Sequence, residues 1–243
     1  MNLTIDIGNT RSKLAIFNSG NIVDNIVLNE INPKSIKEFT SNHPNIQNII
    51  ISSVKEMNRE LIHFLKSESN NVIDLSSRTE IPIKNLYETK ETLGKDRLAA
   101  VVGANNIFPD TNVLVIDMGT AITFDFIDNK SQYIGGTISP GLDMRFKSLN
   151  QHTNKLPLLE KKDSTSLIGK NTDNAIISGV QNGITFETDS YINHFNSTYE
   201  NLKTILTGGD AIFFDKKLKN TIFVNLNINL IGLNTILEYN IRK

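Results

Sequence analysis

The chain contains no cysteine. This absence excludes disulfide bonds, thiolate metal sites and a cysteine nucleophile. The histidines, His43, His63, His152 and His194, have no metal-ligand spacing, so core or surface roles are favoured for all of them. No apolar run approaches the roughly 18 residues that a membrane span needs, and no basic segment leads into an apolar stretch near residue 1. We therefore expect a cytoplasmic protein with no membrane partner.

Neither sign of charge is in excess. Lys and Arg number 25 against 26 for Asp and Glu, and a net charge of -1 leaves no electrostatic footprint for nucleic acid. Two common nucleotide-binding motifs, GxxxxGKS/T and a GxGxxG that follows a strand, are also absent. A length of 243 residues, 39% hydrophobic and 21% charged, is ordinary for a globular protein of one large or two small domains. Small neutral or acidic metabolites remain as candidate ligands.

The first part of the chain alternates between two hydrophobic periods. Strands are expected at residues 3–7, 13–17, 22–28, 47–53 and 71–76. Between them, residues 32–43 predict a short helix with Pro33 near its first turn. A second helix is expected within 55–68, where Met57, Leu61, Ile62 and Leu65 have helical spacing. This alternation indicates a layered α/β domain.

The same order of features begins again near the middle of the chain. Asp6 and Asp117 each end an apolar strand, enter a glycine turn and are followed by two more strands; their offset is 117 − 6 = 111 residues. Later segments predict helices over about 141–149, 174–195 and 229–239, with a strand within 203–210. We interpret this as an internal duplication into domains 1–110 and 111–243, divided near the helix stop at Pro109.

The first turn, "DIGNTRSK", has two interpretations. Taken alone, it is a hairpin, because Gly and Asn supply the backbone angles of a short turn. Alternatively, its successive N–H groups form an anion-binding concavity, to which Asn9, Thr10 and Lys13 add donors and positive charge. Asp6 cannot bind phosphate directly, and its natural partner would be Mg²⁺. The set therefore fits a metal nucleotide better than a bare anion.

Two further turns extend this pattern. In "DMGTAIT", Asp117 is a candidate cation ligand and Thr120 a candidate phosphate donor, whereas Asp125 is either a ligand or an ordinary strand residue. The turn "LTGGDA" follows a strand and opens a helix, where the backbone can approach adenine or ribose closely. A GG turn before a helix is more often an ordinary loop, so this assignment depends on the others.

The stretch "ETLGKDRLAAVVGA" predicts an apolar helix that begins just after Gly94. Its first turn carries Asp96 and Arg97, and both have a plain interpretation, because the helix dipole stabilises an acid there and Arg97 can be solvated. In the functional alternative, Asp96 is a general base toward an alcohol and Arg97 binds a substrate carboxylate. The residues alone leave both interpretations open.

Together these stretches resemble one family, the type III pantothenate kinases. The resemblance lies in "DIGNTRSK", a tyrosine nine residues before the aspartate of "GKDR", "DMGTAITFD", "GGTISPGL", "GKNTDNAIISG" and "LTGGDA", in the family's order along nearly the whole chain. It implies the actin, Hsc70 and sugar kinase fold, with two duplicated ribonuclease H-like domains and a central nucleotide cleft. It also implies ATP-dependent phosphorylation of pantothenate, the first step of coenzyme A biosynthesis.

The resemblance also implies roles for individual residues. MgATP would contact Asp6, Ile7, Gly8, Asn9, Thr10, Arg11, Ser12, Lys13 and Thr120. Pantothenate would contact Tyr87, Gly94, Lys95, Asp96, Arg97 and Thr172, the last donated across a homodimer interface. Asp96 would be the general base, Asp117 would bind potassium or ammonium, and Asp6 is a possible Mg²⁺ ligand.

Three rival functions use part of the same pattern. An ATP-dependent scaffold would keep the nucleotide turns without an acceptor pocket. A sugar kinase or polyphosphate phosphatase would share Asp6 and Asp117 but not the set from Tyr87 to Arg97. A metabolite-binding regulator is the third, although the near-neutral charge disfavours direct DNA binding.

Overall fold

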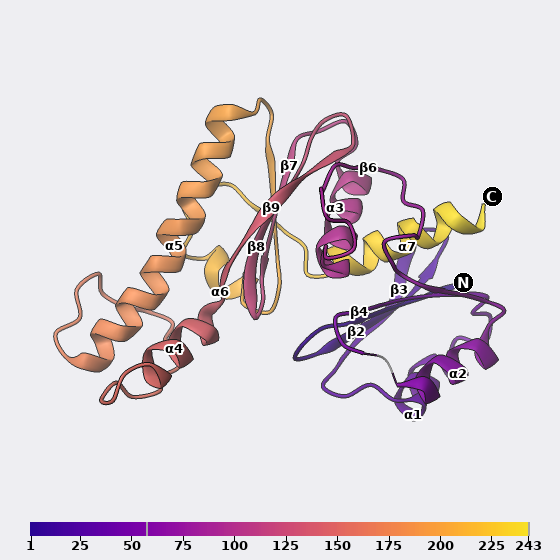
Figure 1. Ribbon diagram of the computed structural model, residues 1–243, viewed down its shortest axis with the longest axis horizontal. Helices are drawn as coiled ribbons and strands as arrows, with labels where there is room; N and C mark the ends of the chain where they lie inside the picture. The colour runs from indigo at the N-terminus through magenta and orange to yellow at the C-terminus, as the bar shows by residue number, and fades with distance from the viewer. Residues whose placement is uncertain (57, 243) are drawn as a thin grey trace. The chain divides into compact units, whose positions relative to one another are not determined.

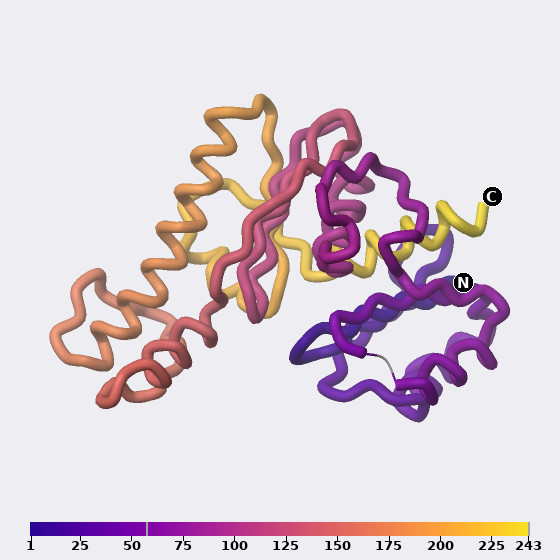
Figure 2. Tube along the Cα trace, viewed as in Figure 1, coloured from indigo at the N-terminus to yellow at the C-terminus, as the bar shows by residue number. Residues whose placement is uncertain are grey.

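The computed structural model describes residues 1–56 and 58–242 and divides into two compact units. Unit 1 comprises Met1–Asp110, Lys130–Ile134 and Asn227–Lys243, and unit 2 comprises Thr111–Asn129 and Gly135–Leu226. The C-terminal residues therefore group with the N-terminal unit, whereas the sequence analysis placed them in the C-terminal half. Figure 2 shows this return of the yellow end of the chain to the purple unit. The cause is packing, because the last helix contacts strands of the first sheet.

Unit 1 begins with a five-stranded sheet. Its elements are β1 (Asn2–Ile7), β2 (Ser12–Asn18), β3 (Asn21–Leu28), α1 (Pro33–Thr40), β4 (Asn48–Ser53), α2 (Arg59–Glu68) and β5 (Asn71–Asp74). The strand order is β3-β2-β1-β4-β5, with β1 antiparallel to β2 and parallel to β4. Each of these elements was expected from the sequence, although Met57 lies outside the described residues.

The period of β1 assigns its two faces. Leu3, Ile5 and Ile7 belong to one buried cluster with side chains of α1 and α2. Successive side chains of a strand point to opposite faces, so Asn2, Thr4 and Asp6 lie on the other side of the sheet. That side meets α7 (Ile228–Ile241), which packs on β1, β2 and β4. Asp6 therefore ends β1 facing the N-terminal turn of α7.

Helix α7 packs against α3 (Lys95–Ile107), as Figure 1 shows. The two helices cross at a pair of glycines, and we call this contact the glycine crossing. A Cβ on Gly232 would lie 1.8 Å from the carbonyl oxygen of Ala99. A Cβ on Gly103 would lie 2.3 Å from the carbonyl oxygen of Ile228. Only glycine permits so close a backbone approach. The crossing fixes the two helices that begin at Lys95 and Ile228, and both N-terminal turns carry polar residues of the candidate site.

Unit 2 holds most of the second sheet. The remaining elements are β6 (Lys84–Asn85), β7 (Val113–Met118), β8 (Ala121–Ile127), β9 (Gln132–Pro140), α4 (Leu142–Gln151), α5 (Thr172–Thr198), β10 (Lys203–Thr207), α6 (Ala211–Asp215) and β11 (Phe223–Val224). The strand order is β11-β10-β7-β8-β9-β6. Apolar side chains of β7, β8, α4, α5 and α6 form its core. The two-residue strands β6 and β11 were not expected, because they are too short to show a period.

The two sheets repeat one topology. In each, an antiparallel pair comes first (β1-β2 and β7-β8), the following strand (β3 or β9) lies beyond its second member, and later strands (β4-β5 or β10-β11) are parallel to its first. The expected α/β duplication is confirmed by this repeat. Among the described residues, no helix has both the length and the apolar character needed to cross a bilayer.

Candidate functional site

The first glycine turn is a hairpin in the structure. Asp6 pairs with Lys13 and Ile7 with Ser12, and the N–H of Gly8 donates to the carbonyl oxygen of Arg11 at 3.0 Å. Between them, residues 9–11 are exposed. The hairpin reading of "DIGNTRSK" is therefore correct for the local backbone. The tip of this hairpin also faces solvent, which an anion-binding turn requires. The buried carboxylate of Asp6 lies at its base.

Asp6 is a buried acid surrounded by polar groups of unit 1. It is 7% exposed, and the Nδ2 of Asn229 donates to its Oδ2 at 3.3 Å. Burial, and after it the negative charge of Asp96, raise the pKa of Asp6 from 3.8 to about 6, against the lowering effects of Asn229, Lys13 and Ser52. The structure thus brings Asp6, Lys13 and Asp96 into one electrostatic environment.

The raised pKa of Asp6 predicts a pH-dependent stability in metal-free buffer. The folded chain binds more protons than the unfolded chain between the unfolded pKa of 3.8 and the folded pKa of about 6. The stabilisation is complete below the lower value and is lost as pH rises through the upper one. We expect the free energy of unfolding to fall by up to about 3 kcal/mol more in the wild type than in Asp6→Asn. Urea unfolding in EDTA from pH 4 to 7 measures the free energy of unfolding of both proteins. The same dependence on pH in the two proteins would contradict a raised pKa of Asp6.

Three buried oxygens around Asp6 have no hydrogen-bond partner: its own Oδ1, the Oγ of Ser52 and the Oδ1 of Asn229. Ser52 lies directly opposite Asp6 on β4. Sequence reasoning missed both Ser52 and Asn229. A polar residue at the end of a buried strand that pairs with β1 was a usable signal for Ser52, but nothing in the sequence connects Asn229 to Asp6 across more than two hundred residues.

The oxygens of this cluster fit a hard cation. Mg²⁺ prefers carboxylate and other oxygen ligands and keeps several waters. Among the described residues, no group of three or more His, Cys, Asp or Glu could hold a metal ion. A cation beside Asp6 would therefore need neutral oxygens as well as carboxylates.

The "GKDR" segment begins α3 as expected. Gly94 is the N-cap, and the Oδ1 of Asp96 accepts a hydrogen bond from the N–H of Arg97 at 2.8 Å. A Cβ on Gly94 would lie 2.5 Å from that Oδ1, so glycine leaves room for the carboxylate. Asp96 is half-buried, and its charge raises the pKa of Asp6. The helix-start role and the functional role of Asp96 are compatible in this geometry.

Arg97 and Tyr87 are brought together from opposite ends of one loop. The guanidinium carbon of Arg97 lies 5.5 Å from the centre of the Tyr87 ring, and that ring stacks on Tyr133 with centroids 6.1 Å apart. Arg97 is 6% exposed and Tyr133 is fully buried. Cation–π contact and burial hold the guanidinium in one place. Two of the expected substrate contacts therefore form a rigid pair.

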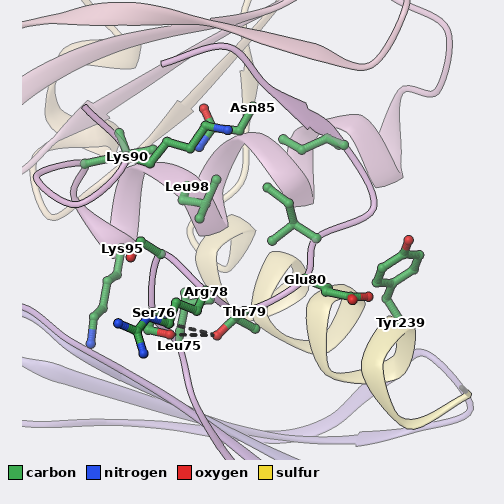
Figure 3. A pocket seen from close by; sticks show the side chains of 14 residues that line it. Leu75, Ser76, Arg78, Thr79, Glu80, Asn85, Lys90, Lys95, Leu98 and Tyr239 are labelled. Carbon is green, nitrogen blue, oxygen red and sulfur yellow. Dashed lines mark hydrogen bonds between the residues drawn. The ribbon is translucent and has the colours of Figure 1, made fainter. Parts of the chain in front are cut away.

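Lys95 points away from that pair. Its Nζ lies 3.3 Å from Oδ1 of Asp74, and its side chain lines a cavity of about 330 Å³ shown in Figure 3. The cavity lies between the 75–93 segment, α3 and Tyr239 of α7. None of Tyr87, Gly94, Asp96 and Arg97 lines it. If a substrate binds to Arg97 and Tyr87, Lys95 would contact it through its backbone.

In unit 2, the other glycine turns converge on Asp117. Asp117 ends β7 in register with Thr207 of β10, so the following turns are neighbours. A Cβ on Gly208, whose φ is +97°, would lie 2.5 Å from Oδ1 of Asp117. A Cβ on Gly141 would lie 2.4 Å from the carbonyl oxygen of Thr120. "DMGT", "SPGL" and "TGGD" thus form one backbone-lined cradle, which the sequence did not predict as a unit.

Two further residues singled out from the sequence, Thr172 and Asp125, lie in unit 2. Thr172 is exposed in the first turn of α5, where Asn171 is the N-cap. It belongs to unit 2, whereas Tyr87, Asp96 and Arg97 belong to unit 1. Asp125 is 1% exposed and pairs with Val115 of β7. It is therefore a buried residue of strand β8.

Comparisons with known proteins agree with these observations. Residues 2–194 match the family model described as type III pantothenate kinase. A protein named type III pantothenate kinase from Phocaeicola vulgatus is 46% identical over 240 residues, which cover 99% of each chain.

Solved structures share the fold over nearly the whole length. One, from Campylobacter jejuni and assigned to the Baf family of transcriptional activators, has a TM-score of 0.62 and 25% identity and covers 99% of this chain and 100% of its own. Another, described as an N-acetylmannosamine kinase from Listeria monocytogenes, has a TM-score of 0.56 and 13% identity with coverage of 98% and 99%. The second likeness places the chain in the fold of the sugar kinases. The matching family model and the identity to its relatives show that this chain belongs to the type III pantothenate kinase family.

Proposed function

We propose that this kinase transfers the γ-phosphoryl group of ATP to the primary hydroxyl of pantothenate, the first step of coenzyme A biosynthesis in the cytoplasm. The observation that carries the proposal is the arrangement in unit 1, where a buried carboxylate, Asp6, lies close to a candidate base, Asp96, and the guanidinium of Arg97 is held against Tyr87 beside it. Neither a scaffold nor a regulator needs this combination.

Asp96 is the proposed general base. It lies beside Asp6, whose pKa it raises, and Gly94 keeps space open at its carboxylate. A base in phosphoryl transfer needs only to accept the hydroxyl proton as the bond to phosphorus forms. Its hydrogen bond from the N–H of Arg97 orients the carboxylate for that role.

Arg97 and Tyr87 are the proposed recognition elements for pantothenate. A guanidinium presents a planar fork that matches a carboxylate. Its contact with Tyr87 fixes the fork before the substrate arrives, which reduces the entropy lost on binding. Gly94 and the backbone of Lys95 would line the same side of the turn.

The proposed nucleotide contacts lie on the glycine turns. The exposed tip at residues 9–11, with Lys13, offers donors for phosphates, and Thr120 offers a hydroxyl beside the cradle of unit 2. Mg²⁺ held near Asp6 would neutralise phosphate charge when bound, and Asp117 would bind potassium or ammonium.

Product identification tests the acceptor. Purified protein is incubated with MgATP and pantothenate, or with N-acetylmannosamine or glucose, and products are separated by mass spectrometry. We expect a phosphorylated product from pantothenate alone. Phosphorylation of a sugar at a comparable rate would overturn the proposal in favour of a sugar kinase.

Arg97→Lys should raise the KM for pantothenate by at least about 10-fold, because an ammonium cannot reproduce a bidentate contact with the carboxylate. The KM for ATP should change less than about threefold. Steady-state kinetics with either substrate varied separate the two effects, and Arg59→Lys on α2 is the matched control. An equal rise in both KM values would show that Arg97 only supports the fold.

Thr172 would complete the pantothenate pocket from a second copy in a homodimer. Exposed apolar side chains in unit 2 support this, among them Leu167 at 67% and Ile168 at 76%, a few residues before Thr172. Surfaces of this kind mark association sites. Sedimentation should detect a dimer that Ile168→Lys weakens by at least about 10-fold. Val27→Lys, at an exposed position of β3, is the control, and a monomeric wild type would contradict the prediction.

A further inference from the structure

The strongest unexplained feature is the group of orphaned oxygens at Asp6. Ser52 is fully buried and Asn229 is 7% exposed, yet Oγ of the first and Oδ1 of the second have no partner within hydrogen-bond distance, although Ser52 is close enough to Asp6 to lower its pKa. Oδ1 of Asp6 is the third such atom. A buried polar atom without a partner costs free energy, and native proteins keep few of them. Three within one cluster indicate a missing ligand that interacts with oxygen.

We propose that Ser52 and Asn229 complete, with Asp6, the binding site for the divalent cation of this enzyme. The inference deepens the proposed function and rests on it for the identity of the cation. It assigns roles to two residues that lie outside every motif of the sequence.

The charge at the cluster selects a cation over an anion. Asp6 and Asp96 are two acids close enough to interact, and Lys13 is the basic group that acts on Asp6. Burial and the neighbouring acid both disfavour the charged form of Asp6. Burial makes such a charge costly, and a bound cation relieves it.

The hydrogen bond from Asn229 orients its amide. Its Nδ2 donates to Oδ2 of Asp6, so its Oδ1 is the atom left to accept or to ligate. Together the side chains offer a carboxylate, an amide oxygen and a hydroxyl. This mixed oxygen set suits Mg²⁺, bound directly or through its waters.

The position of Asn229 is fixed from both sides of α7. Further along this helix, Oδ1 of Asn234 accepts from Nδ2 of Asn2 at 2.9 Å, and Asn2 in turn accepts from Asn48 at 2.8 Å. The glycine crossing with α3 holds the opposite side. A ligand on so constrained a helix is preorganised, as metal sites require.

Binding of Mn²⁺, a spin-active substitute for Mg²⁺, tests the proposal without ATP or pantothenate. Free Mn²⁺ is measured by electron paramagnetic resonance during titration of wild type, Ser52→Ala and Asn229→Ala. We expect each variant to weaken Mn²⁺ binding by about 10- to 100-fold. Asn105→Ala is the matched control, because Oδ1 of Asn105 is also buried and unpartnered but Asn105 is not among the groups that act on Asp6. It should bind as the wild type does.

Asn229→Asp separates a ligand from a structural support. It loses the donor to Asp6 and adds a repulsive charge, so without metal its melting temperature should fall. It keeps an oxygen ligand, so saturating Mn²⁺ should restore more of the loss than in Asn229→Ala. Equal losses with and without Mn²⁺ would overturn the proposal, as would unchanged Mn²⁺ affinity in the alanine variants or no Mn²⁺ binding by the wild type. An enzyme that binds Mn²⁺ here but does not phosphorylate pantothenate would overturn the proposed function alone.

Discussion

Replacing Asp96 by Asn should lower kcat by about 10²- to 10⁴-fold, the range that a general base typically contributes. The amide is nearly isosteric, and its Oδ1 can still accept the hydrogen bond from Arg97. What it loses is the ability to take the hydroxyl proton. Binding of MgATP, measured by calorimetry, should remain within about threefold of the wild type, because Asp96 makes no proposed contact with the nucleotide.

The control for this substitution separates catalysis from helix capping. Glu60 is an exposed acid in the first turn of α2 and has no proposed contact with any substrate. Glu60→Gln removes a similar helix-dipole interaction, worth about 0.3–1 kcal/mol, and should leave kcat unchanged. If Asp96→Asn lost only stability, or lost ATP affinity as severely as turnover, Asp96 would be a structural start of α3.

Gly232→Ala should destabilise unit 1 by about 3 kcal/mol, at the upper end of overpacking effects. The new methyl group would lie 1.8 Å from the carbonyl oxygen of Ala99 and 2.8 Å from the N–H nitrogen of Gly103. Both obstacles are backbone atoms, so no side chain can rotate away to make room. For a chain of this length, the loss corresponds to a fall of roughly 6–12 °C in melting temperature.

Asn106→Ala is the matched control on the exposed side of α3. It adds a good helix former without meeting α7 and should change stability by less than about 0.7 kcal/mol. Chemical unfolding of both variants measures the difference. A Gly232→Ala variant as stable as Asn106→Ala would mean that the two helices do not cross at these glycines.

Helices and strands could be predicted from the sequence wherever the spacing of apolar residues repeated over enough positions. The apolar run from Leu3 to Ile7 predicted the strand, and Gly94 marked the start of α3. The helix α7 was also predicted, but its assignment to unit 1 was not. That assignment depends on backbone contact between Gly232 and Ala99, which are far apart in the chain and give no local pattern.

The candidate site divides in the same way. Asp6, Asp96 and Asp117 lie in motifs where a strand or helix boundary meets a glycine, so residue type and position both indicated chemistry. Ser52 and Asn229 became visible only as unpartnered buried atoms. A property that depends on which groups lack partners in space has no counterpart in the linear sequence.

The central claim is phosphoryl transfer to pantothenate, and a coupled ADP-release assay tests it most directly. Purified protein and MgATP are measured with and without pantothenate, in potassium and again in sodium alone. The account predicts ADP release that requires pantothenate and falls steeply when sodium replaces potassium. ADP that appears equally without pantothenate, or no ADP in any condition, would contradict it, and "GKDR" would then be only the beginning of a helix.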